Sequence, residues 1–141
     1  MKTIVDSFTV GCTGDAVAGD EILFTEAVFG GSYRKPRFLG ERRIAARVLK
    51  DSYGAAKQQH TFTIEAIASD GYDPLPAGTR TTRKGRNVYR NGTFRRPWAE
   101  DRGGEAARQA ARADKHARGD NARVARADRR AADEIERPWR Y

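Results

Sequence analysis

Residues 41–51, ERRIAARVLKD, contain the pattern that decides the fold. The apolar side chains of Ile44 and Val48 stand at even positions, together with an alanine. The cations Arg43 and Arg47 stand at odd positions. Successive side chains of a β-strand point to opposite faces, so this period of two predicts a strand with one buried and one solvent-facing side. The two arginines are expected on the solvent side, about 13–14 Å apart at 3.3–3.4 Å per residue.

Further strand signals occur on both sides of this stretch. Residues 60–68, HTFTIEAIA, alternate in the same way, and residues 21–29, EILFTEAVF, are rich in strong β-formers. Residues 3–10 and 79–82 show shorter patterns of the same kind. Glycines, prolines and aspartates lie between these stretches and predict turns. Five or six short strands predict a mainly β fold, either a small antiparallel bent sheet or an SH3-like barrel.

The composition changes abruptly toward the C-terminus. Residues 99–141 are rich in Ala and Arg and favour helix. The Gly-Asp-Asn sequence at 119–121 interrupts this pattern, so two helices are expected, over about 105–118 and 121–137. The chain is therefore predicted to divide into a basic β-domain over residues 1–98 and a C-terminal α-helical extension.

Each expected helix has one distinctive face. In the first helix, four cations fall on one face at spacings of four, three and three: Arg108, Arg112, Lys115 and Arg118. The second helix carries only a narrow apolar stripe, which limits the surface it buries. We therefore expect the helices to project from the body or to pack on a partner.

Positive charge is concentrated in the middle of the chain. The sequence carries a net charge of +8, with −4 over residues 1–30 and +10 over residues 31–98. A clustered basic patch attracts anions and accelerates association with them. Arg outnumbers Lys, which suits bidentate contacts to phosphate, although a GC-rich genome produces the same bias.

The most basic stretch is residues 79–98, TRTTRKGRNVYRNGTFRRPW, with seven cations and no carboxylate. Asn91-Gly92 lies at its centre. This dipeptide favours a two-residue type I′ turn, because both residues tolerate positive φ. Residues 87–90 and 93–95 are therefore expected to pair as a β-hairpin.

A second basic loop spans residues 30–40 and contains both cations and aromatic residues. We expect it to combine with the hairpin into one basic surface. The candidate binding residues are Arg34, Lys35, Arg37, Arg43, Arg47, Arg80, Arg83, Lys84, Arg86, Arg90, Arg95 and Arg96. The candidates for stacking on bases are Tyr33, Tyr89 and Phe94. Aromatic side chains of a small β-fold also commonly belong to the core.

Lys and Arg supply most of the sequence-independent affinity for nucleic acid, because they neutralise phosphates. The sequence therefore predicts a non-enzymatic protein that grips the backbone of DNA or RNA through these cations. The alternative is a phage or mobile-element protein. Such a protein would bind an acidic surface of a host nucleic-acid machine and inhibit it through the same basic surface and helical tail.

Several other function classes have no support in the sequence. Cys12 is the single cysteine and there are two histidines, which argues against an internal disulfide and a conventional zinc site. His60 has no second matching motif and a P-loop is missing, so no catalytic residue, cofactor or small-molecule substrate is expected. No apolar run approaches the roughly 20 residues of a membrane span, and no secretory signal is recognisable. We expect a cytoplasmic protein without a membrane partner.

Overall fold

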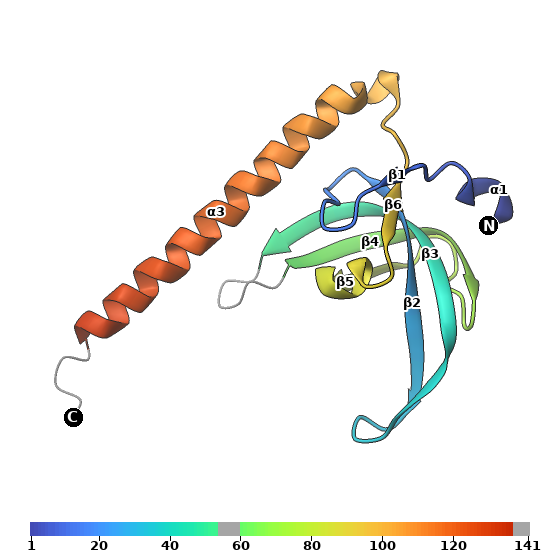
Figure 1. Cartoon of the computed structure of the whole chain (residues 1–141), viewed down its shortest axis with the longest axis horizontal. Helices are drawn as coiled ribbons and strands as arrows, with labels where there is room; N and C mark the ends of the chain where they lie inside the picture. Colours follow the sequence, from blue (N-terminus) through green and yellow to red (C-terminus); the bar gives the residue numbers. More distant parts are fainter. Residues whose placement is uncertain (54–59, 137–141) are drawn as a thin grey trace.

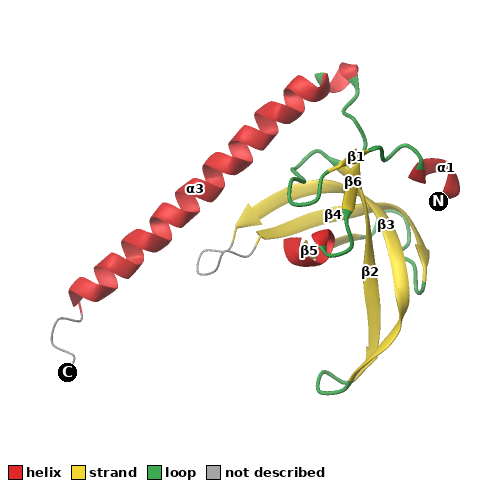
Figure 2. Ribbon diagram, in the orientation of Figure 1, coloured by secondary structure: helices red, strands yellow, loops and turns green. Residues whose placement is uncertain are grey.

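A computed structural model describes residues 1–53 and 60–136. Six strands form one antiparallel sheet in the order β1-β6-β2-β3-β4-β5, and a long helix follows it (Figure 1). The sheet is open, with β1 and β5 as its edges, and it bends strongly along β3 and β4 (Figure 2). The predicted mainly β fold with a helical C-terminal extension is confirmed, in its bent-sheet form.

Four helical segments accompany the six strands. The strands are β1 (Val10–Gly11), β2 (Glu21–Gly31), β3 (Pro36–Tyr53), β4 (His60–Gly71), β5 (Arg80–Lys84) and β6 (Thr93–Arg95). The helical segments are α1 (Lys2–Val5), α2 (Gly85–Tyr89), the 3-10 turn η1 (Glu100–Arg102) and α3 (Gly104–Glu136).

The three long strands β2, β3 and β4 contain the stretches predicted from residue alternation. β3 is 18 residues long and pairs with β2 on one side and β4 on the other. Its ladders contain three irregularities, one with β2 and two with β4. Bulges increase the bend and twist of a strand, which accounts for the curvature of this sheet.

The core lies on the inner face of the bend. Even positions in the central parts of β2, β3 and β4 are buried there, and Phe24, Ile44 and Phe62 are examples. Helix α2, the short yellow coil in Figure 1, lies inside the curve and adds Val88 to this core. Arg47, at an odd position of β3, is exposed, as the alternation predicts.

The predicted β-hairpin around Asn91-Gly92 is wrong. The residues before this turn form α2, and β6 after it pairs with β1 and β2. Val88 is completely buried, and the ring of Tyr89 packs edge-on against Phe62 at 5.9 Å. Burial of these side chains inside the curved sheet outweighs the local hairpin preference. Gly92 nevertheless has the expected positive φ, 86°.

The strand expected over residues 3–10 is largely absent. Its first half forms α1, and only Val10 enters β1. Phe8 is buried, and the guanidinium of Arg96 lies 4.6 Å from the centre of its ring. This packing against a distant arginine, rather than a strand ladder, holds the segment.

The C-terminal region contains one helix of 33 residues, so the prediction of two helices is wrong. Gly119, the expected break, lies buried within α3. A glycine inside a helix costs only about 0.5–1 kcal/mol, which the helix-forming neighbours offset. Asp120 and Arg123 also form an ion pair one turn apart. No helix within the described residues is long and apolar enough to cross a membrane.

The cationic face of α3 packs on the β-domain through buried ion pairs. Arg108 donates from Nε to Oδ1 of Asp20 over 2.9 Å, and both side chains are almost completely buried. Asp20 also accepts a 2.7 Å hydrogen bond from Nε1 of Trp98. Arg112 binds Asp15 over 2.7 Å. The first half of the helix is thus tied to the β-domain instead of projecting from it.

Two further cations continue this contact along α3. Lys115 is buried, donates to the carbonyl oxygen of Ala16, and lies 5.4 Å above the centre of the Phe62 ring. Arg118 forms an ion pair with the buried carboxylate of Asp51. The four cations predicted on one helix face therefore make intramolecular contacts.

Candidate nucleic-acid interface

The outer face of the sheet carries a row of alternating charges. Glu21, Arg47, Glu65 and Arg80 occupy adjacent register positions on β2, β3, β4 and β5. Glu65 accepts from Arg80 at 2.8 Å and lies 3.6 Å from Arg47. Two of the predicted binding arginines therefore share one carboxylate.

Three more of the predicted binding arginines have carboxylate partners. Their pairs are Arg43 with Asp70, Arg95 with Glu105, and Arg96 with Glu21. The hydrogen bond from Arg43 lowers the pKa of Asp70 below its usual value. Arg95 is only 7% exposed, so it is largely hidden from a ligand. These cations looked uncompensated because their partners lie far away in the sequence.

Glu26 is the centre of a third group of charges, on the inner face of β2. Arg42 donates to its Oε1 and Arg83 to its Oε2, each over 2.8 Å. Burial by itself raises the pKa of this carboxyl, but the hydrogen bonds from Arg83 and Arg42 lower the pKa below the usual value. Glu26 is therefore ionised and is neutralised by two guanidinium groups.

The remaining predicted cations lie at two places. Arg34, Lys35 and Arg37 lie in and beside the turn between β2 and β3. Arg86, Arg90 and Lys84 belong to α2 or flank it. Among residues 1–53 and 60–136, no carboxylate forms an ion pair with the three cations of the turn, with Arg86 or with Arg90. These five exposed side chains are the predicted binding residues that remain available to an external anion.

The β2–β3 turn, here called the hairpin tip (residues 32–37), is basic and aromatic. Tyr33 is fully exposed. Phe29 and Phe38 face each other across the strands at the base of the tip, 6.0 Å apart and edge to face, and each is 57% exposed. Gly31 has a φ of 80°, and a Cβ there would lie 2.7 Å from the carbonyl oxygen of Lys35. The tight turn therefore requires glycine.

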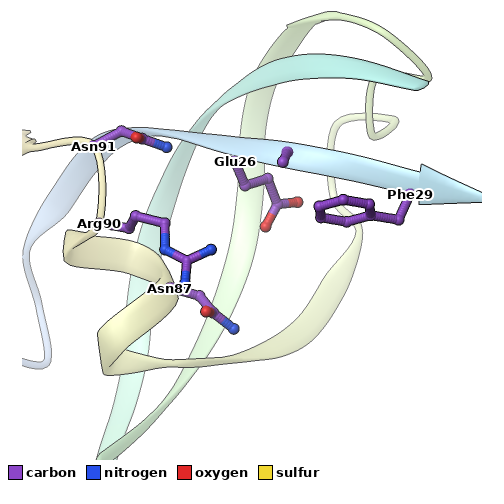
Figure 3. A pocket seen from close by; sticks show the side chains of 6 residues that line it. Glu26, Phe29, Asn87, Arg90 and Asn91 are labelled. Carbon is purple, nitrogen blue, oxygen red and sulfur yellow. The ribbon is translucent and has the colours of Figure 1, made fainter. Parts of the chain in front are cut away.

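A pocket opens between β2 and α2, close to the hairpin tip. Figure 3 shows Glu26 and Phe29 projecting into it from β2, and Asn87 and Arg90 from the side of α2. Ala27 and Asn91 complete the lining, and Asn91 donates a 3.1 Å hydrogen bond to a backbone carbonyl of β2. A second hollow runs from Phe29 along the tip to Tyr33. The two hollows share Phe29, and together we call them the β2 groove.

Residues 12–98 match the family described as Domain of unknown function (DUF7699). The chain belongs to the DUF7699 family. The matched segment begins directly after β1 and contains the strands β2 to β6 and the whole β2 groove. Helix α3 follows the matched segment.

One relative is "Zinc finger CCCH domain-containing protein 62" from Oryza sativa subsp. japonica. It is 41% identical over 142 residues, which cover 97% of this chain and 20% of the relative. The chain thus spans about a fifth of the length of that curated protein. With its single cysteine, this DUF7699 chain does not itself contain the three cysteines of a CCCH finger. No solved structure matches it significantly.

The three predicted stacking residues of this DUF7699 protein have different environments. Tyr33 is fully exposed at the hairpin tip, and Phe94 is 47% exposed on β6. Tyr89 packs on Phe62, and its hydroxyl accepts a 3.0 Å hydrogen bond from the amide of Ala16. Tyr89 is therefore a core residue, which is the alternative role considered for these aromatics.

Sequence reasoning missed Phe29 and Asn87 as groove residues and Glu26 as the carboxylate between two arginines. The sequence pattern predicts only a strand position for Phe29. Phe29 is at an odd position of its strand, whereas the buried Ile22 and Phe24 are at even positions. It also directly precedes the basic loop. That position was the available signal. No sequence signal identified Asn87, because its position depends on helix α2, which the sequence did not predict.

Two observations concern metal ligands and the thiol in the described part of the chain. No group of three His, Cys, Asp or Glu side chains there is arranged to hold a metal ion. Burial, helped by the charge of Asp20, raises the pKa of Cys12 to about 12, so its thiol stays protonated at neutral pH.

Proposed function

We propose that this protein is a non-enzymatic nucleic-acid-binding protein that holds backbone phosphates at the hairpin tip and at α2. One observation carries the proposal. Most of the other described arginines pair with carboxylates, whereas five exposed cations on either side of the β2 groove do not. They are Arg34, Lys35, Arg37, Arg86 and Arg90.

An anionic ligand provides a physical reason for this arrangement. Neighbouring like charges repel one another, and a bound phosphate chain relieves that repulsion and forms charge-assisted hydrogen bonds. Arginine matches phosphate geometry with two parallel N–H groups. The cations of the tip are attached to paired strands, so binding would order less backbone than binding by an unstructured tail.

The name of the rice relative is compatible with this proposal. The rice relative is named for a zinc finger, and zinc fingers include nucleic-acid-binding modules. A cytoplasmic location and a ligand that is either DNA or RNA are also parts of this proposal.

The proposal is tested by measuring binding of a labelled random duplex and a labelled single strand as salt increases. We expect log affinity to fall linearly with log salt concentration. The variant Arg34→Ala/Lys35→Ala/Arg37→Ala removes three phosphate contacts, so its slope on duplex should be shallower by about 2.7.

A matched control loses the same charge from the paired arginines of the outer face, as Arg43→Ala/Arg47→Ala/Arg80→Ala. Its slope should stay near that of the wild type. Failure of the wild type to bind either nucleic acid at low salt would overturn the proposal. A protein partner that is retained in a pull-down after nuclease treatment would then support the inhibitor alternative.

A further inference from the structure

We infer that the β2 groove binds unpaired bases, so that the preferred ligand is single-stranded nucleic acid. The inference rests on the proposed function and specifies its ligand. It is drawn from the side chains that line the groove and from the open edge of β2 beside it.

Phe29 provides the surface for stacking. Its ring belongs to both hollows of the groove and is 57% exposed. The edge-to-face contact with Phe38 holds the ring in position. Bases stack on such aromatic faces regardless of their identity. Tyr33, at the far end of the second hollow, offers a second ring for a neighbouring base.

Asparagine amides lie at the other wall of the groove. Nδ2 of Asn91 is used in a hydrogen bond to the carbonyl of Thr25, which holds this side chain and leaves its Oδ1 for a ligand. Within the described residues, no hydrogen bond occupies the side chain of Asn87. An amide presents both donors and acceptors, which suit the edge of a base.

The charges around the groove also suit a phosphate-linked chain. Arg90 lines the groove and has no carboxylate partner within the described residues. Glu26 also lines it, but its negative charge is neutralised by Arg42 and Arg83. The carboxylate therefore repels a nearby phosphate little, and the local charge is positive.

The edge of β2 is open along this groove. β6 pairs with β2 only at Ile22, Leu23 and Phe24. Beyond Phe24, α2 and the groove lie along this same edge of β2. The bases of a duplex are stacked and paired, and they expose only their edges. The ring of Phe29, beside the edge of β2, can therefore stack only on a base that is not held inside a double helix.

The test compares fluorescence anisotropy of labelled oligouridylate RNA, oligothymidylate DNA and a duplex of equal length, with the full chain at moderate salt. We expect the single strands to bind at least several-fold more tightly than the duplex. The two single-stranded arms distinguish RNA from DNA. Phe29→Ala should weaken single-strand binding by about five- to a hundredfold and leave duplex binding unchanged.

Tyr72→Ala is the matched control, because Tyr72 is an aromatic residue of similar exposure, 46%, that does not line the groove. Its affinity for single strands should lie within about twofold of the wild-type affinity. Thermal unfolding should show that both variants remain folded. A 2-aminopurine base in the oligonucleotide reports stacking directly. Its fluorescence should be quenched by the wild type and by Tyr72→Ala, and not by Phe29→Ala.

The outcomes separate this inference from the proposed function. If the wild type binds no nucleic acid, the proposed function fails. If the hairpin-tip variant loses binding while Phe29→Ala binds single strands and quenches 2-aminopurine like the wild type, the proposed function stands and this inference is overturned. Equal affinity for duplex and single strand also overturns it.

Discussion

Asp20 is the residue on which the contact between the β-domain and α3 depends. Its side chain is completely buried and accepts hydrogen bonds from the amide of Val17, the indole of Trp98 and the guanidinium of Arg108. A buried charge is tolerated only when its partners are in place. The carboxylate therefore connects the segment before β2 with Trp98 and with α3, which follow about 80 to 90 residues later.

Asp20→Asn keeps the shape of this side chain and removes its charge. The buried guanidinium of Arg108 then lacks its closest counter-charge, so the free energy of unfolding should fall by about 3–5 kcal/mol in urea titrations. Asp70→Asn breaks a more exposed pair with Arg43 and should cost about 0–1 kcal/mol. Equal losses in the two variants would contradict the role assigned to Asp20.

His60 should make stability depend on pH. Burial and the nearby charge of Lys115 lower its pKa from 6.5 to about 4. Because the unfolded chain binds this proton more readily, the contribution of His60 is complete above pH 6.5 and is lost as pH falls toward 4. His60→Gln should therefore flatten the dependence of unfolding free energy on pH between 5 and 6.5.

The exposed His116 is the matched control for this measurement. His116→Gln should retain the wild-type slope in the same pH window, measured by urea unfolding at several pH values. An unchanged slope in His60→Gln would show that burial of this imidazole does not control its protonation.

At the scale of elements, α3 consists of two halves that differ in their contacts. The half before Gly119 carries the four cations that contact the β-domain. The half after it is exposed where its side chains are described, and Val124 is 58% exposed. The first half is thus part of the folded unit, although sequence composition placed the boundary near residue 98.

Two truncations test this division. Removal of residues 120–141 should change the free energy of unfolding by no more than about 0.5 kcal/mol, because the side chains described after Gly119 are exposed. Removal of residues 104–141 deprives Asp20 and Asp51 of their arginine partners and should cost at least about 3 kcal/mol. Both are read out by urea unfolding. Identical unfolding midpoints would show that the helix is an appendage.

At the scale of the whole molecule, the acidic N-terminal segment neutralises cations from the rest of the chain. Glu21 and Glu26 pair with arginines that follow much later, and Asp15 and Asp20 pair with α3. The net charge of the middle segment is therefore a poor guide to the surface. Of the predicted binding residues, the exposed cations without a carboxylate partner in the described part of the chain lie at the hairpin tip and on or beside α2.

Residue alternation predicted the three long strands correctly, because it is a local property that Ile44, Phe62 and their neighbours display in any extended chain. Local rules failed at Asn91-Gly92 and at Gly119. At both places a long-range contact opposed a local preference: burial of Val88 under the sheet, and packing of α3 on the β-domain.

Only part of the candidate site could be predicted, because the rest depends on contacts between distant segments. The cations of the hairpin tip could be identified, because they lie within one turn and have no neighbouring carboxylate in sequence. The pairing of Arg83 with Glu26 and of Arg96 with Glu21 could not, because 57 and 75 residues separate the partners. The β2 groove likewise requires α2 to lie beside Phe29.

The sequence by itself therefore determined the mainly β character, the helical C-terminal region and the excess of positive charge in the middle of the chain. These follow from periodicity, intrinsic propensity and composition, which depend on neighbouring residues alone. Only the tertiary structure decided which cations are neutralised and where a groove forms. The reason is that ion pairs and concave surfaces depend on distances between segments, and the folded sheet sets those distances.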